Sequence, residues 1–360
     1  MQSSKDIFLS LVRSGVGHET ESIPNQVNWS EIRALADRQG LSAVVLDGIE
    51  RLSTENRPSK DIALPWIGEV VQMESRSDAQ TKTATSLGEL FHSNGIRTYV
   101  LKGAIVAECY PKPKHRLSAD MDCFLLPSEG DADVWQFGND LVKEKGYEVS
   151  EGFYKNSSFH LPGLMVENHR FMTPFRGNKN LRRLEIVLQE MIRSDKGENR
   201  INDTWLYRPP VMMSALFLIE HAYSHFLHEG LTLRMVLDWM IFTRKHKVEI
   251  DWITLSALID DFGFRKFYDS FYRLGKYSLG ELAAENLMPE DLRMLDDIWA
   301  PLDLHESLGG VKAKFQLAGN IWRARWKYRY FTDMTWARAL SEWVLGAVFE
   351  RRKHPINHVY

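Results

Sequence analysis

The middle of this chain differs from both of its ends in hydrophobic spacing. From residue 29 to residue 93 apolar residues recur at helical intervals, with a long helix expected over 65–93, and helical spacing returns from about residue 209. Between these parts, β-branched and aromatic runs are typical of strands at 96–101, 120–126, 157–161 and 164–171. A chain of this pattern cannot form a helical bundle or a β-sandwich alone, so we expect an α+β fold.

The spacing divides the chain into three parts. We expect an N-terminal helical region over 1–94, a small mixed α/β core over 95–205 and a C-terminal helical domain over 206–360. Pro162-Gly163 suits the central positions of a type II turn and predicts a hairpin between the last two strands. The core is therefore expected to be a mixed β-sheet with helices, flanked by helical regions on both sides.

Composition excludes several classes of protein. The 45 Lys+Arg nearly balance 48 Asp+Glu, so a protein that coats nucleic acid is not expected. Two cysteines cannot build a disulfide framework, which favours a reducing, cytoplasmic compartment. The longest apolar stretch, 211–219, is about half of the ~20 residues that a membrane span needs, and no signal peptide opens the chain. We therefore expect no membrane span.

One segment is locally basic despite the balanced total. Residues 307–332 contain six Lys or Arg and no Asp or Glu, with aromatic residues between them. The spacing of Trp322 and Trp326 predicts a helix that packs both rings inward while the cationic side chains point outward. A contact with an anionic acceptor, a triphosphate or single-stranded nucleic acid is the alternative.

Two aspartates lie on one predicted strand. Asp120 and Asp122 are separated by one residue, so both carboxylates project from one face while Met121 and Cys123 project from the other. Aspartate is a poor strand former, and two carboxylates this close repel unless a cation lies between them. The pair therefore predicts a site for Mg²⁺ or Mn²⁺, with an exposed strand edge as the alternative.

Residues on either side of this pair suit phosphate chemistry. Lys102-Gly103 lies where the first strand turns into a helix, and a glycine at a helix N-terminus lets a phosphate approach the backbone. Downstream, Glu167 and His169 share one face of a later strand. Glu167 is the preferred third carboxylate, and Glu185, on another possible strand, competes with it.

Together these motifs resemble the nucleotidyltransferase superfamily of the DNA polymerase β type. More closely, they are similar to an uncharacterised bacterial nucleotidyltransferase family in the runs Val100-Leu101-Lys102-Gly103, Arg116-Leu117-Ser118-Ala119-Asp120-Met121-Asp122 and Val166-Glu167-Asn168-His169. His221-x-x-x-His225 and Arg234-x-x-x-Asp238 resemble the helical pattern near the C-terminus of that family. One departure is Ala104, which stands where the superfamily usually has a small polar residue after the glycine.

The resemblance implies a two-metal transfer of a nucleoside monophosphate from an NTP, with ATP expected, to an unknown acceptor. The acceptor could be a small molecule, a glycan or a protein. The catalytic and metal-binding residues would be Asp120, Asp122 and Glu167. The triphosphate would be bound by Lys102, Gly103, Arg116 and Ser118. Further residues of the cleft would be His169, His221, His225, Arg234 and Asp238.

Other interpretations of the same residues remain open. A metal-dependent phosphohydrolase would use water as the acceptor, and Ala104 is compatible with a non-catalytic nucleotide-binding or adaptor module on a degenerate transferase fold. The face that carries His221, His225 and His228 could bind zinc or simply pack against other helices. Arg234 and Asp238, four residues apart on a predicted helix, could pair with each other.

Overall fold

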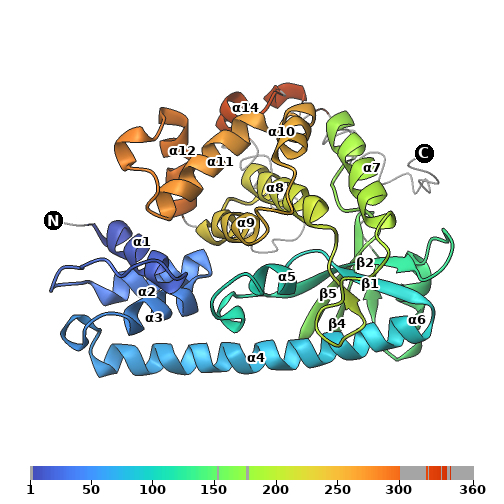
Figure 1. Ribbon diagram of the computed structural model, residues 1–360, viewed down its shortest axis with the longest axis horizontal. Helices are drawn as coiled ribbons and strands as arrows, with labels where there is room; N and C mark the ends of the chain where they lie inside the picture. Colours follow the sequence, from blue (N-terminus) through green and yellow to red (C-terminus); the bar gives the residue numbers. More distant parts are fainter. Residues whose placement is uncertain are drawn as a thin grey trace.

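The computed structural model describes residues 3–151, 154–175, 178–300, 322, 324–333, 335–338 and 341. A mixed six-stranded sheet lies between two helical parts, with the long helix α4 (Lys60–Ser93) along one side and α8 (Val211–His228) and the later helices on the other (Figure 1). This arrangement confirms the predicted α+β fold class. The exact domain boundaries stay a prediction.

The central strand of the sheet carries the two aspartates. The strands are β1 (Ile96–Val100), β2 (Asp120–Pro127), β3 (Val149–Ser150), β4 (Asn156–Leu161), β5 (Leu164–His169) and β6 (Leu206–Tyr207), in the order β3-β4-β5-β2-β1-β6. β2 is antiparallel to β1 and parallel to β5. The β4–β5 hairpin turns at Pro162-Gly163 as predicted. β3 and β6 were not predicted, because two residues are too few to show a strand pattern.

Local signals set both ends of the helix at 29–39. The remaining helices are α1 (Ser4–Gly15), α2 (Trp29–Gln39), α3 (Ser42–Glu50), α5 (Ala104–Ala107), α6 (Trp135–Glu144), α7 (Lys179–Arg193), α9 (Leu233–Lys245), α10 (Trp252–Asp261), α11 (Arg265–Ser278), α12 (Pro289–Trp299) and α14 (Arg325–Phe331). Gly40 ends α2 in the left-handed conformation that favours glycine. The N-cap of α2 is Asn28, whose side chain accepts a hydrogen bond from Glu31 N.

The segment around Glu185 forms helix α7 and not the possible strand considered from the sequence. Leu181, Leu184, Leu188 and Ile192 bury one face at intervals of three and four residues. The five apolar-rich residues 184–188 are too short a window to distinguish that period from the period of a buried strand.

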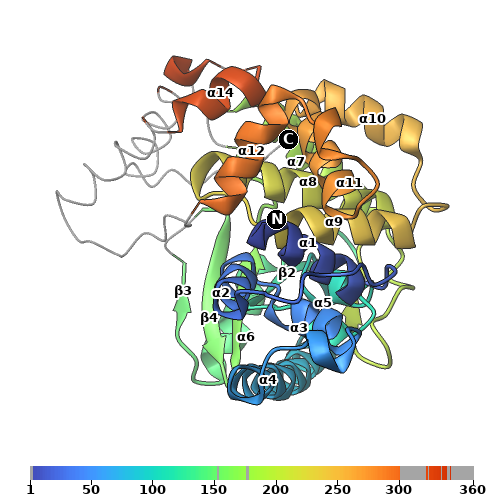
Figure 2. The ribbon, with the colours of Figure 1, turned by 90° about the vertical axis from the view of Figure 1, so that its left-hand side faces the viewer.

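Helices α1 and α3 pack against each other at backbone distance. A Cβ atom added at Gly15 would lie 2.0 Å from Val44 O, and one at Gly48 would lie 2.1 Å from Leu11 O. Only glycine permits this approach at either position. Figure 2 shows the resulting group of α1, α2 and α3 between α4 and the later helices α11 and α12.

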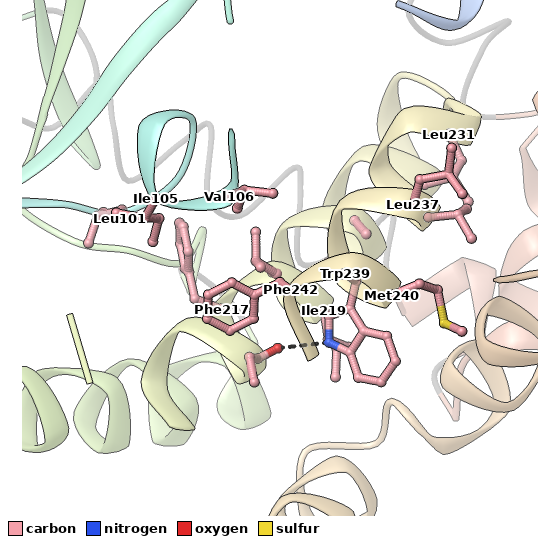
Figure 3. Close-up of a cluster of buried hydrophobic side chains, with 14 of the residues drawn as sticks. Leu101, Ile105, Val106, Phe217, Ile219, Leu231, Leu237, Trp239, Met240 and Phe242 are labelled. Atoms are coloured by element: carbon pink, nitrogen blue, oxygen red, sulfur yellow. Dashed lines mark hydrogen bonds between the residues drawn. The ribbon is translucent and has the colours of Figure 1, made fainter. Parts of the chain in front are cut away.

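A hydrophobic cluster attaches the turn after β1 to the C-terminal helices. Leu101, Ile105 and Val106 lie beside Phe217 of α8, and the cluster continues to Trp239 of α9 (Figure 3). The indole Nε1 of Trp239 donates to Ala215 O at 3.1 Å. The turn that holds Lys102 and Gly103 is thus positioned by tertiary packing as well as by the sheet.

The basic segment differs in part from its prediction. Trp326 packs edge-on against Phe226, but Trp322 is 55% exposed. Lys327 is buried, and its Nζ donates to Phe226 O at 2.6 Å and contacts Asp297 at 2.8 Å. The prediction is therefore wrong for the ring of Trp322, which precedes α14, and for the side chain of Lys327, which points inward. Residues 307–321 and residue 323 lie outside the described part of the chain.

Within the residues that the structure describes, no helix has both the length and the apolar character needed to cross a membrane.

Candidate active site

The carboxylates meet where β2 and β5 run side by side. The parallel register places Asp122 directly beside Glu167, and Asp120 lies two residues earlier on β2. One oxygen each of Asp122 and Glu167 and one ring nitrogen of His169 all lie within 4.8 Å of one another. The side chains of Asp122, Glu167 and His169 are therefore neighbours across the sheet, on the faces that the alternation along each strand predicted.

Lys102 lies against the aspartate pair. Its Nζ is 3.0 Å from Asp122 Oδ2 and 3.8 Å from Asp120 Oδ2. Burial and the negative charge of Asp122 raise the pKa of Asp120. For Asp122, burial acts in the same direction, but Lys102 and His169 outweigh it and hold the pKa well below its usual range. Asp122 is therefore ionised at any pH near neutrality.

His169 orients Asp122 from the other side. Its Nε2 lies 2.9 Å from Asp122 Oδ1 and 3.5 Å from Glu167 Oε2, while Nδ1 lies 3.1 Å from Phe171 O. A carbonyl oxygen only accepts, so Nδ1 donates to it, and Nε2 donates to the carboxylate. Burial alone would lower the pKa of His169, but the two carboxylates raise it. The ring is thus favoured in its charged form.

Glu185 lies elsewhere, on α7. Its buried carboxylate accepts hydrogen bonds from the backbone N–H groups of Met172 and Thr173 and from the side chain of Gln189. Burial raises its pKa. The structure therefore brings Glu167, and not Glu185, to the aspartates.

Gly103 occupies a position in the turn after β1 where a larger residue does not fit. Its φ is +70°, and a Cβ atom there would lie 2.9 Å from Ser118 Oγ and 3.9 Å from Arg116 Nη1. Ser118 Oγ donates to Asp120 O at 3.1 Å. The helix that follows, α5, has only four residues, so its dipole is weak. The positive charge at this turn comes mainly from the side chains of Lys102 and Arg116.

Arg116 forms a buried ion pair with Asp238 of α9. Arg116 Nε and Nη2 donate to the carboxylate at 3.2 and 2.7 Å, and Tyr110 Oη donates to it at 2.8 Å. Burial would raise the pKa of Asp238, but Arg116 holds it below its ordinary value. Arg234 donates to Leu117 O instead, so the suggested pairing of Arg234 with Asp238 is not what forms.

Sequence reasoning missed Tyr110 as part of this cluster. Tyr110 and Asp238 are 128 residues apart, and a buried tyrosine carries no local pattern that would identify its partner.

The helical histidines do not act as one group. His221 Nε2 lies 3.4 Å from Lys102 Nζ, which links α8 to the carboxylates. His225 pairs with Glu229 at 2.9 Å, and His228 Nδ1 donates to Ser224 O. These histidines belong to no metal-binding group in the part of the chain that the structure describes, so the zinc alternative finds no support.

The donor set at the aspartates suits a hard divalent cation. Asp122 Oδ2 is buried and accepts no hydrogen bond from any described residue, although Lys102 Nζ lies close to it. Carboxylate oxygens of this kind are the ligands that Mg²⁺ and Mn²⁺ prefer. A group of acidic and histidine residues here could therefore hold a metal.

Comparison with known proteins agrees with this geometry. A family model described as an uncharacterised nucleotidyltransferase matches residues 25–279, which include the carboxylate strands and helices α8 and α9. Neither a curated protein nor a solved structure matches the chain. The family model covers more than half of the 360 residues, and the chain therefore belongs to the uncharacterised nucleotidyltransferase family.

Proposed function

We propose that this protein transfers a nucleoside monophosphate from an NTP, with ATP as the first candidate, to a hydroxyl of an acceptor. The acceptor is a small molecule, a glycan or a protein. The observation that carries the proposal is the group of Asp120, Asp122 and Glu167 beside Lys102 on one sheet, in a chain of this family.

The carboxylates are the proposed metal ligands. Asp120 and Asp122 would hold Mg²⁺ or Mn²⁺, and Glu167 would complete the site or accept the proton of the acceptor hydroxyl. Such cations, when bound, neutralise charge on phosphate oxygens and make a coordinated hydroxyl more acidic. His169 keeps the Asp122 carboxylate oriented through its hydrogen bond to Oδ1.

The neighbouring turn is the proposed phosphate site. Gly103 would bring the backbone close to the triphosphate, and Ser118 and Lys102 lie beside this glycine. Asp238 engages Nε and Nη2 of Arg116, and the remaining nitrogen, Nη1, lies on the Gly103 side. Lys102 and Arg116 Nη1 can donate to phosphate oxygens, and Ser118 would do so after its hydroxyl turns away from Asp120 O.

A labelling assay tests the proposal. The protein is incubated with each α-³²P-labelled NTP, Mg²⁺ and a cell extract, and both pyrophosphate and labelled adducts are followed. We expect pyrophosphate and adduct to appear together and EDTA to abolish both. Asp122→Asn should lower the rate by at least about 10²-fold, as the loss of a charge-stabilising group does. Asp261→Asn, an exposed residue paired with Arg183, is the matched control.

The other outcomes separate the alternatives. Labelled free nucleotide without an adduct would indicate a phosphohydrolase, and nucleotide binding without pyrophosphate release would indicate a non-catalytic module. Identical behaviour of the wild type, Asp120→Asn and Asp122→Asn with every acceptor would refute the catalytic assignment.

A further inference from the structure

Lys102 already occupies the place beside the aspartates where the proposed function requires a divalent cation. Its Nζ has three acceptors around it: Asp122 Oδ2 at 3.0 Å, His221 Nε2 at 3.4 Å and Asp120 Oδ2 at 3.8 Å. Only the contact with His221 is a hydrogen bond, and the two carboxylates act on the ammonium group through their charge. The side chain is 15% exposed and so is largely enclosed by these groups.

The contact between Lys102 and Asp122 depends on charge more than on directed hydrogen bonding. Asp122 Oδ2 accepts no hydrogen bond of normal geometry from any described residue despite the 3.0 Å distance to Nζ. Asp122 Oδ1, in contrast, has a hydrogen bond from His169 at 2.9 Å. Asp120 lies beyond hydrogen-bonding distance of Nζ. A side chain held in this way can be displaced by an ion of higher charge.

We propose that Lys102 is a tethered cation that is exchanged during nucleotide binding. In the free protein it neutralises Asp120 and Asp122, and it moves onto the triphosphate when the metal-bound nucleotide enters. This inference rests on the proposed function, because it requires a metal and a triphosphate to meet at these carboxylates.

The exchange follows from the space available. Mg²⁺ binds carboxylate oxygen at about 2.0–2.1 Å. An ammonium 3.0 Å from the same Asp122 oxygen would then lie within a few ångströms of the metal, in a partly buried site where like charges repel strongly. The metal and the Lys102 ammonium therefore cannot both remain at Asp122, and the tethered one moves.

The new position of the ammonium is close by. Lys102 directly precedes Gly103, and the turn at this glycine lies close to Ser118 Oγ and Arg116 Nη1. The lysine side chain has four flexible carbons and three rotatable donors. A change of its rotamer is enough to carry the positive charge from the carboxylates to a phosphate at this turn.

Binding of Mn²⁺ alone tests the first half of the proposal. Mn²⁺ is titrated into the wild type, Lys102→Met and Lys114→Met, and free Mn²⁺ is measured by electron paramagnetic resonance. Lys102→Met should bind Mn²⁺ at least about fivefold more tightly than the wild type, the lower end of common coupling between two sites. Lys114→Met removes the same charge from a half-exposed pair with Asp78 and should not change the affinity.

Binding of a nucleotide tests the second half. With Mn²⁺ saturating, Lys102→Met should bind α,β-methylene ATP at least about fivefold more weakly than the wild type, by the same coupling argument. Equal or weaker Mn²⁺ binding by Lys102→Met overturns the proposal. Tighter Mn²⁺ binding with unchanged nucleotide affinity also overturns it, because Lys102 would then not move onto the phosphates.

A measurement on the wild type keeps the proposal testable if Lys102→Met does not fold. Lys102 is acetylated with a mild amine-reactive reagent, and the extent of its acetylation is followed by mass spectrometry. The rate should rise when Mn²⁺ is added and fall again when α,β-methylene ATP follows. Lys114 is the internal control in the same digest. An acetylation rate of Lys102 that changes with neither addition overturns the proposal.

Failure of this inference and failure of the proposed function give different results. If Mn²⁺ releases Lys102 and the nucleotide captures it, but no adduct forms with any acceptor, the tethered cation stands and nucleotidyl transfer fails. If an adduct forms while Lys102 does not respond, transfer stands and the tethered cation fails.

Discussion

Removing the carboxylate of Asp238 is expected to lower the free energy of unfolding by about 3–5 kcal/mol, because it leaves a buried guanidinium without its partner. Asp238 is 4% exposed and Arg116 is 8% exposed, so water cannot replace the lost acceptor in Asp238→Ala. The same change removes three hydrogen bonds, two from Arg116 and one from Tyr110. The size of the effect comes from these buried donors, which are left without an acceptor.

Urea unfolding followed by circular dichroism measures the loss. The control is Asp261→Ala, an exposed partner of Arg183, which should cost no more than about 1 kcal/mol. The double variant Arg116→Met/Asp238→Leu should be more stable than Asp238→Ala, since it removes both charges together. A loss below about 1 kcal/mol for Asp238→Ala, equal to the exposed control, would contradict the argument.

The same pair predicts a pH dependence. Arg116 holds the pKa of Asp238 below its ordinary value. A carboxylate with a lowered pKa contributes stability above its ordinary pKa, and this stability is lost as the pH falls through the native value. The difference in unfolding free energy between the wild type and Asp238→Ala should therefore be full at neutral pH and shrink below about pH 4. A difference that stays constant down to about pH 2 would show that the pKa of Asp238 is the same in the native and the unfolded protein.

Three further predictions concern other parts of the molecule. Gly48→Ala should lose about 1–3 kcal/mol of unfolding free energy, because its Cβ would lie 2.1 Å from Leu11 O. Gly68→Ala has open space around the new Cβ and should gain about 0.5–1 kcal/mol. Equal shifts of the melting temperature in the two variants would contradict this. Glu167→Gln should reduce adduct formation about 10–100-fold while Glu185→Gln retains it, and the reverse order would reassign the third carboxylate. Burial lowers the pKa of His115, but hydrogen bonds to carboxylates of α3 and α4 raise it above its ordinary value. The stability that it adds is complete below about pH 6.5 and lost as the pH rises through the raised pKa, so His115→Asn should cost more at about pH 6 than at about pH 9 in urea unfolding.

The local pattern of the sequence was enough for the four longer strands, β1, β2, β4 and β5, and for the faces of the side chains on them. Alternation along β2 predicted that Asp120 and Asp122 lie on one face, and the structure shows both near Lys102. The Pro162-Gly163 hairpin and the end of α2 were likewise readable from a few neighbouring residues. These features depend on backbone geometry within one element, which the nearby residues control.

Tertiary structure alone decided which residues meet. Glu185 was a candidate for the metal site on sequence grounds, but it lies on α7, where it accepts hydrogen bonds from the backbone N–H groups of Met172 and Thr173. Asp238 pairs with Arg116, which lies 122 residues earlier in the chain, instead of with the nearby Arg234.

Lys102 and His221, 119 residues apart, meet because a buried hydrophobic cluster presses the turn after β1 onto α8 and α9. Contacts between distant segments depend on how helices and strands pack. The hydrophobic period of a strand, about two residues, or of a helix, about 3.6 residues, carries no information about that packing. The sequence determined the fold class and the face of the sheet that bears the carboxylates. The packing of the C-terminal helices decided that His221 lies beside Lys102 and that Asp238 pairs with Arg116.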